Sequence, residues 1–91
     1  MLVNFENWLR EHENYKFVIN NNELSDSLII DIDEENCLAR FTLWDDLSCM
    51  SEVINVSTGQ YMLDKREEFN NLEELLIIFK EFTKAVSSLL P

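Results

Sequence analysis

Glycine and proline are almost missing from this chain of 91 residues, which has one of each, Gly59 and Pro91. A phosphate-binding loop needs several glycines close together, so nucleotide sites of that kind are excluded. Flexible linkers are typically rich in glycine, serine or proline, and no such tract and no repeat occurs. We therefore expect one folded domain over residues 1–91, a usual size for a single domain.

Basic residues are also scarce. Seven Lys and Arg residues stand against 18 Asp and Glu residues, which gives a formal net charge of -11. A negative field of this size repels DNA, RNA and anionic lipid, so nucleic acid and membrane surfaces are excluded as partners. Residues 21–60 hold nine acidic residues and one basic residue, Arg40. Two interpretations stay open: a solvated surface that resists aggregation, or steering toward a basic partner.

The residue types of common catalytic and metal sites are few. The sequence has one histidine, His12, and two cysteines, Cys37 and Cys49, without CxxC or HExxH spacing. His12 falls in the charged part of a predicted helix, where a surface histidine is expected. The strand register below places Cys37 in the core and Cys49 on the outer face, too far apart for a disulfide and without an activating base. These features predict a protein with no cofactor, no metal and no enzymatic activity.

One acidic run has the spaced carboxylates that open a calcium loop, Asp31-Ile32-Asp33-Glu34-Glu35. An EF-hand loop needs a glycine at its sixth position and a glutamate at its twelfth. This sequence has Asn36 and Thr42 at those positions. An acidic hairpin turn is therefore the better interpretation.

Long apolar runs are absent as well. None approaches the ~20 residues that a membrane-spanning helix needs. Residues 1–6 do not have the basic and apolar pattern of a signal peptide. We therefore expect a cytoplasmic protein whose cysteines are reduced.

Two segments have the periodicity of amphipathic helices. The first runs from about residue 3 to 13, with Leu2, Phe5, Trp8 and Leu9 on one side. The second begins at Asn70, whose side chain can cap a helix while Glu73 lies at the third helical position. It reaches about residue 88, and its apolar stripe consists of Leu72, Leu75, Leu76, Phe79, Val86 and Leu90.

Four segments between the helices have the composition and alternation of strands. They cover residues 28–33, 37–44, 49–56 and 61–66, and turn-like connections join them. Short connections join antiparallel neighbours, so we expect a four-stranded meander. Residues 15–19 give a weaker signal, for either a fifth strand at an edge or an extension of the first helix.

Register predicts which side chains share a face. A hairpin turning at Glu34-Glu35 pairs Phe41 with Leu28, Ala39 with Ile30 and Cys37 with Ile32, an apolar set. Four-residue loops after the next two strands add Met50, Ile54, Val56, Tyr61 and Leu63 to that face. Both helices are expected to cover it, which predicts an α+β, two-layer αββββα sandwich. Glu52 also falls on the covered face, a misfit that the pattern does not explain.

The opposite face of the predicted sheet mixes apolar and charged side chains. It contains Ile29, Asp31, Asp33, Leu38, Arg40, Thr42, Trp44, Cys49, Ser51, Val53, Asn55, Met62, Asp64 and Arg66. An exposed tryptophan with apolar neighbours and a polar rim is typical of a protein-binding patch. The alternatives are that the loop over residues 20–27 buries this face or that a homodimer does.

Several segments resemble those of a known family. They are Phe5-Glu6-Asn7-Trp8-Leu9, the hairpin from Ile30 to Trp44 with its Ala-Arg-Phe-Thr-Leu-Trp end, the run from Glu52 to Gly59, and the closing helix from Asn70. In these segments the chain resembles the TriTu group of small immunity proteins of bacterial polymorphic toxin systems, over most of its length. It departs from the family pattern after Trp44, where a glycine near Leu47 and an acidic residue near Met50 are expected.

The resemblance implies a cytoplasmic protein that binds and blocks the C-terminal toxin domain of a contact-dependent inhibition or Rhs-type effector. Such toxins are often nucleases with basic clefts, which an acidic protein approaches rapidly. The candidate partner-binding residues lie on the exposed face and its acidic turns: Asp31, Asp33, Glu34, Glu35, Leu38, Arg40, Trp44, Asp45, Asp46 and Val53. Trp44 is the expected apolar anchor, and Glu34 and Glu35 are the expected steering charges.

Two other functions are weighed against this one. A small acidic adaptor or secretion chaperone would bind an isolated amphipathic segment instead of a folded toxin. A carboxylate-dependent hydrolase would need a cleft with perturbed carboxyl groups, which the sequence does not indicate. The immunity function fits the acidic surface best.

Overall fold

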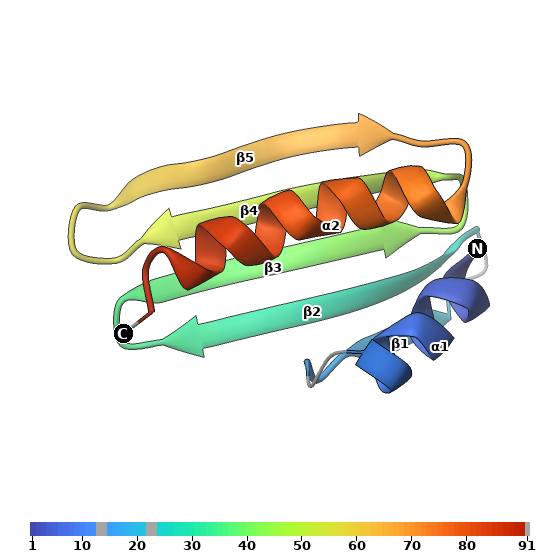
Figure 1. Ribbon diagram of the computed structural model, residues 1–91, viewed down its shortest axis with the longest axis horizontal. Helices are drawn as coiled ribbons and strands as arrows, with labels where there is room; N and C mark the ends of the chain where they lie inside the picture. Colours follow the sequence, from blue (N-terminus) through green and yellow to red (C-terminus); the bar gives the residue numbers. More distant parts are fainter. Residues whose placement is uncertain (13–14, 22–23, 91) are drawn as a thin grey trace.

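Five antiparallel strands form one sheet in the computed structural model of the chain (Figure 1). The structure describes residues 1–12, 15–21 and 24–90. In chain order the elements are α1 (Leu2–His12), β1 (Val18–Asn21), β2 (Asp26–Glu34), β3 (Cys37–Trp44), β4 (Ser48–Asn55), β5 (Gln60–Glu68) and α2 (Leu72–Ser87). Each strand pairs with the next one along the chain, so the sheet is a meander.

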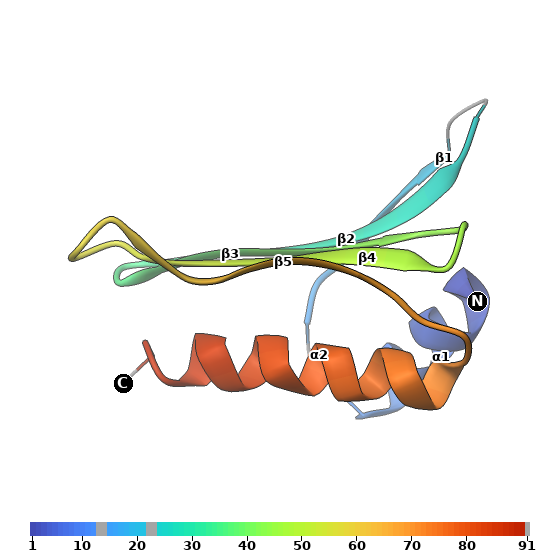
Figure 2. The same ribbon diagram turned by 90° about the horizontal axis from the view of Figure 1, so that it is seen from above.

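Both helices lie on the same side of the sheet and leave the other side uncovered (Figure 2). This arrangement confirms the predicted α+β sandwich, and β1 supplies a fifth strand at one edge. Over the described residues, neither helix is long and apolar enough to span a membrane. The sheet thus has one face packed against helices and one open face.

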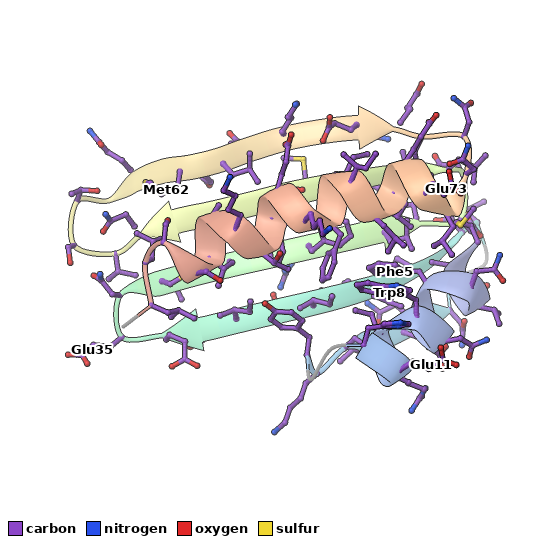
Figure 3. The ribbon with its side chains drawn as sticks, in the orientation of Figure 1. Phe5, Trp8, Glu11, Glu35, Met62 and Glu73 are labelled. Carbon is purple, nitrogen blue, oxygen red and sulfur yellow. The ribbon has the colours of Figure 1, made fainter. Side chains whose placement is uncertain are left out.

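Aromatic rings from α1, β3 and α2 form the centre of the core. The ring centroid of Phe79 lies 5.2 Å from that of Phe5 and 5.1 Å from that of Phe41. Figure 3 shows Phe5 and Trp8 on the side of α1 that faces α2, whereas Glu11 points away. Burying side chains of this size contributes about 1.5–3 kcal/mol each, which holds both helices on the sheet.

Helix α2 begins one residue later than predicted. The side-chain oxygen of Asn71, not that of Asn70, caps it by accepting a 2.9 Å hydrogen bond from the backbone N–H of Glu74. The Glu74 carboxylate in turn accepts a 2.9 Å hydrogen bond from the backbone N–H of Asn70. Glu74, at the third helical position, therefore takes the place that the sequence predicted for Glu73, but it accepts from the residue before the cap and not from the cap itself.

The buried stripe of α2 consists of Leu75, Phe79, Phe82 and Val86. The predicted stripe contains three of these residues and lacks Phe82. It also includes Leu90, which is exposed because the helix ends at Ser87 and its periodicity ends there too.

The β2–β3 hairpin turns at Glu35-Asn36, one residue beyond the predicted centre. Ile30 therefore faces Phe41 and Ile32 faces Ala39, a shift of two residues from the predicted pairs. A shift of two leaves every side chain on its predicted face, because side chains alternate with a period of two. The apolar residues predicted for the core from these strands accordingly pack there.

The β3–β4 hairpin has a three-residue turn from Asp45 to Leu47, where the sequence predicted a loop of four. Leu47 adopts a left-handed φ of 65°, as the last residue of such a turn commonly does. The difference of one residue reverses the faces of β4. Toward the helices lie Cys49, Ser51 and Val53, and on the open face lie Met50, Glu52 and Ile54. The predicted faces of β4 are therefore wrong.

The reversal of β4 removes the misfit at Glu52, which lies opposite Arg40 on the open face. It also brings Cys49 into the core, so both cysteines are buried and free. Burial, assisted by the Glu67 carboxylate, raises the pKa of the Cys49 thiol to about 11. Burial also raises the pKa of Cys37. Thiols in this state are protonated near neutral pH and are poor nucleophiles.

A register shift at Val53 and Ile54 interrupts the pairing of β4 with β5. Leu63 pairs with Val53 and packs against the core, as predicted. Tyr61 pairs with Ile54 and is 54% exposed, so its predicted position on the covered face is wrong. Met62 lies between them as the extra residue of a bulge, which a face-counting prediction does not include.

Candidate functional site

A row of charged side chains crosses the middle of the open face. Strand pairing aligns Asp31 with Arg40, Arg40 with Glu52, and Glu52 with Asp64. Arg40 donates two hydrogen bonds to Asp31, from Nε to Oδ1 at 2.7 Å and from Nη2 to Oδ2 at 3.3 Å. This bidentate contact fixes the orientation of both side chains.

Arg40 is the one base in this row. Its hydrogen bond to Asp31, the charge of Asp31 and the charge of Glu52 raise the pKa of Arg40 above its ordinary value. Asp64, at the end of the row, forms no ion pair within the described part of the chain. The row is therefore net negative and keeps a carboxylate available for a cation from outside.

A shallow hollow of about 440 Å³ lies on the open face and includes Asp31, Arg40 and Glu52 of the charged row. Its lining mixes charged and apolar residues: Asp31, Ile32, Asp33, Leu38, Ala39, Arg40, Glu52 and Ile54. Leu38 pairs with Asp33 on one side and with Ile54 on the other, and it is 42% exposed. Such a lining suits a Lys or Arg side chain, which has an apolar stem and a cationic head.

Trp44 lies near the opposite end of β3 and is partly buried. The guanidinium carbon of Arg66 lies 4.9 Å from the centroid of its ring, a cation–π distance. Arg66 pairs with Met50, which pairs with Thr42 in turn. Because Arg66 already covers one side of the ring, Trp44 is a less open anchor than the sequence predicted.

The two acidic turns predicted as contacts lie at opposite ends of β3. Glu34 ends β2 and Glu35, labelled in Figure 3, lies in the β2–β3 turn, whereas Asp45 and Asp46 lie in the β3–β4 turn. The eight residues of β3 separate them. At ~3.3 Å per residue this is about 25 Å. The structure therefore does not bring the two acidic pairs together.

Asp45 and Asp46 also hold their own turn. Oδ2 of Asp45 accepts a 2.9 Å hydrogen bond from the backbone N–H of Asp26, and the N–H of Asp45 donates to the Asp26 carbonyl at 3.1 Å. Oδ1 of Asp46 accepts a hydrogen bond from the Ser48 hydroxyl. Both carboxylates therefore have structural partners before any other protein binds.

On strands β2 to β5 the open face carries more acids than bases. The acids are Asp31, Asp33, Glu52, Asp64 and Glu68, and the bases are Arg40 and Arg66. Within the described ranges, no three side chains of His, Cys, Asp or Glu gather closely enough to hold a metal ion. His12 is exposed, as predicted, and stacks on Trp8 with 5.0 Å between ring centroids.

A family model described as "Immunity protein TriTu" matches residues 4–85. The chain belongs to this family. The matched residues run from α1 into α2 and include all five strands. None of the curated proteins compared with the chain matches it.

Membership of TriTu confirms the resemblance seen in the sequence. The general function of an immunity protein is toxin neutralisation, and its partner is a toxin protein. An immunity protein is typically non-enzymatic. Surfaces that can contact another protein are therefore the places where function is expected.

The predicted partner-binding residues of this TriTu protein fall into three groups. Asp31, Asp33, Leu38, Arg40 and Trp44 lie on the open face, and Glu34, Glu35, Asp45 and Asp46 lie at the two turns. The predicted exposure of Val53 is wrong, because its side chain is 0% exposed beneath the helices.

Sequence reasoning missed Glu52 and Ile54, which take the place of Val53 on the open face. The glycine that the family pattern favours near Leu47 was the available signal. A left-handed residue at that point indicates a three-residue turn, and that turn length sets the faces of β4.

Proposed function

We propose that this immunity protein neutralises a bacterial toxin domain by binding it with the open face of its sheet. The proposed partner is the C-terminal toxin domain of a contact-dependent inhibition or Rhs-type effector, and a nuclease with a basic cleft fits best. The proposed place of action is the bacterial cytoplasm. Family membership supports toxin neutralisation in general, and the features of the open face support the finer proposal.

The observation that carries the proposal is a carboxylate beside an exposed apolar side chain. Asp33 pairs with Leu38 across β2 and β3, and Asp33 forms no ion pair with any described residue. A Lys or Arg of the toxin can bind the Asp33 carboxylate while its stem covers Leu38. A charge-assisted hydrogen bond of this kind contributes about 1.5–3 kcal/mol.

The whole-chain charge acts before contact. A net charge of -11 attracts a basic domain over a distance and speeds its approach, and salt weakens this attraction. Glu34, Glu35, Asp45 and Asp46 are proposed to contribute mainly at this stage, because they lie at the two ends of the face. Contacts on the open face then slow dissociation.

Occupation of a basic cleft explains how binding neutralises the toxin. A nuclease needs the cations of its cleft to hold an anionic substrate. The acidic face of this protein binds the same cations, so protein and substrate exclude one another.

Co-expression identifies the toxin. Reading frames that neighbour the gene are expressed alone and together with this chain, and the frame that stops growth alone but not together encodes the toxin. Its purified toxin domain is then titrated with wild type, Asp33→Lys and Glu11→Lys. Both variants change the net charge from -11 to -9. Glu11, however, lies on α1 and points away from the core (Figure 3).

Asp33→Lys is expected to raise Kd at least about tenfold, and Glu11→Lys less than about threefold, because only Asp33 lies on the open face. Equal effects of both variants would mean that total charge decides affinity, and the open-face contact would be wrong. A chain that rescues no growth and binds an isolated secreted segment is instead the adaptor or secretion chaperone.

A further inference from the structure

The sheet ends in two edges that differ in their protection. Strand β5 carries five charged residues among its nine, Asp64 to Glu68 without interruption, and a bulge disturbs its pairing. Charges and bulges on an edge strand hinder the addition of another strand. The β5 edge is therefore protected against pairing with another strand.

Strand β1 has none of these protections. Its sequence is Val-Ile-Asn-Asn, without a charged residue or a proline, and all four residues are exposed. Val18 is 61% and Ile19 is 37% exposed. Figure 2 shows β1 and the adjoining end of β2 bending away from the helix layer, so the edge projects from the body of the molecule.

The backbone of β1 offers hydrogen-bonding groups at this edge. Asp26 directs its N–H and its carbonyl toward Asp45, away from β1. Backbone groups alternate in direction along an antiparallel strand, so the next residues to face β1 are Ser27 and Ile29, which pair with Asn20 and Val18.

The residues of β1 that alternate with Val18 and Asn20 therefore direct their backbone groups outward. They are Ile19 and Asn21, and each has one N–H and one carbonyl at the free edge. The strand also has apolar side chains on both faces, since Val18 pairs with Ile29 and Ile19 with Leu28. Leu24, in the same hairpin, is 98% exposed. A strand added at this edge could form backbone hydrogen bonds with β1 and pack against its apolar side chains.

We propose that β1 accepts an extended strand of the toxin domain, which pairs with Ile19 and Asn21 and extends the sheet. The inference rests on the proposed function, because it names a second contact for the same toxin. A second copy of this chain is the less favourable occupant, since two copies would bring together net charges of -11 each. A basic toxin bound to the open face can also contact β1, because β1 belongs to the same sheet.

The variant test uses the outward N–H of Ile19. Proline at this position removes that N–H and is tolerated at an edge whose N–H groups face solvent. Ile19→Thr is the matched control, because it also removes the ethyl group of the isoleucine side chain and keeps the N–H. Relative to Ile19→Thr, Ile19→Pro is expected to raise Kd for the purified toxin domain at least about tenfold.

Amide hydrogen exchange tests the wild type directly. On addition of the toxin domain, exchange at Ile19 and Asn21 is expected to slow at least about tenfold, while Asn20 is already protected by β2. Equal affinities of the two variants together with unchanged exchange would overturn the strand pairing and leave the proposed function in place. A dimer of the free protein that Ile19→Pro dissociates would assign the edge to a second copy and also overturn it. Absence of toxin binding by every variant would remove the proposed function and this inference together.

Discussion

Arg66 of β5 lies over the ring of Trp44 of β3, with 4.9 Å from its guanidinium carbon to the ring centroid. Replacing Arg66 by Gln removes this contact and is expected to lower the free energy of unfolding by about 0.5–1 kcal/mol. In a Trp8→Phe background, the fluorescence of Trp44 is expected to shift to longer wavelength as water reaches the ring. Lys65→Gln is the control, since Lys65 projects from the other face of β5. An equal shift in both variants would contradict the contact.

Phe79 of α2 contacts aromatic rings of both helices and of β3 in the core. Its ring contacts five others, those of Phe5, Trp8, Tyr15, Phe41 and Phe82. Phe79→Ala is expected to lower the free energy of unfolding by about 3–5 kcal/mol in urea denaturation. Ile77→Ala on the same helix, where the side chain is 65% exposed, is expected to change it by less than about 0.5 kcal/mol. Similar losses from both substitutions would place the core elsewhere.

Leu47 holds the left-handed φ that defines the β3–β4 turn. Such a φ costs a residue with a Cβ about 1–2 kcal/mol, and glycine avoids this cost. Leu47→Gly is therefore expected to be more stable than Leu47→Ala by about 1 kcal/mol, because both variants lose the side chain beyond Cβ and only alanine keeps the Cβ that the left-handed φ disfavours. Thermal unfolding of the two proteins measures the difference. An alanine variant as stable as the glycine variant would mean that the turn has another conformation.

The raised pKa of Cys49 predicts a loss of stability in alkali. The unfolded thiol loses its proton near its ordinary pKa of 9.0, whereas the folded thiol keeps it up to about 11. The contribution of this thiol to the free energy of unfolding is therefore fully present below about pH 9. It falls by up to roughly 2 kcal/mol as the pH rises to about 11. Urea denaturation across this range measures the fall. Cys49→Ala is expected to show a smaller fall, and an unchanged fall would exclude Cys49 as its source.

Periodicity predicted the two helices and the faces of β2 and β3 because it depends on local alternation. The β2–β3 turn was misplaced, but the resulting shift of two residues kept Ile30 and Phe41 on the core face. The predicted contacts Asp31, Asp33, Leu38, Arg40 and Trp44 are on the open face for the same reason.

Two positions where the backbone departs from regular geometry could not be predicted in this way. Leu47 takes a conformation that glycine usually marks, and without glycine the turn was given one residue too many. That error exchanged Val53 for Ile54 on the open face. The same reversal put Tyr61, the partner of Ile54, on the open face, and the bulge at Met62, which no alternation pattern signals, returned Leu63 to the covered face.

The most direct test of the open face as the toxin-binding surface places the same new charge on its two sides. Leu38, which is 42% exposed, lies on the open face, and Ile77, which is 65% exposed, lies on the helix layer. The affinity for the purified toxin domain is measured for Leu38→Lys and Ile77→Lys at about 0.15 M salt. Leu38→Lys is expected to raise Kd at least about tenfold, with Ile77→Lys close to wild type. A loss of affinity in Ile77→Lys with Leu38→Lys unchanged would show that the helix layer, and not the open face, binds the toxin.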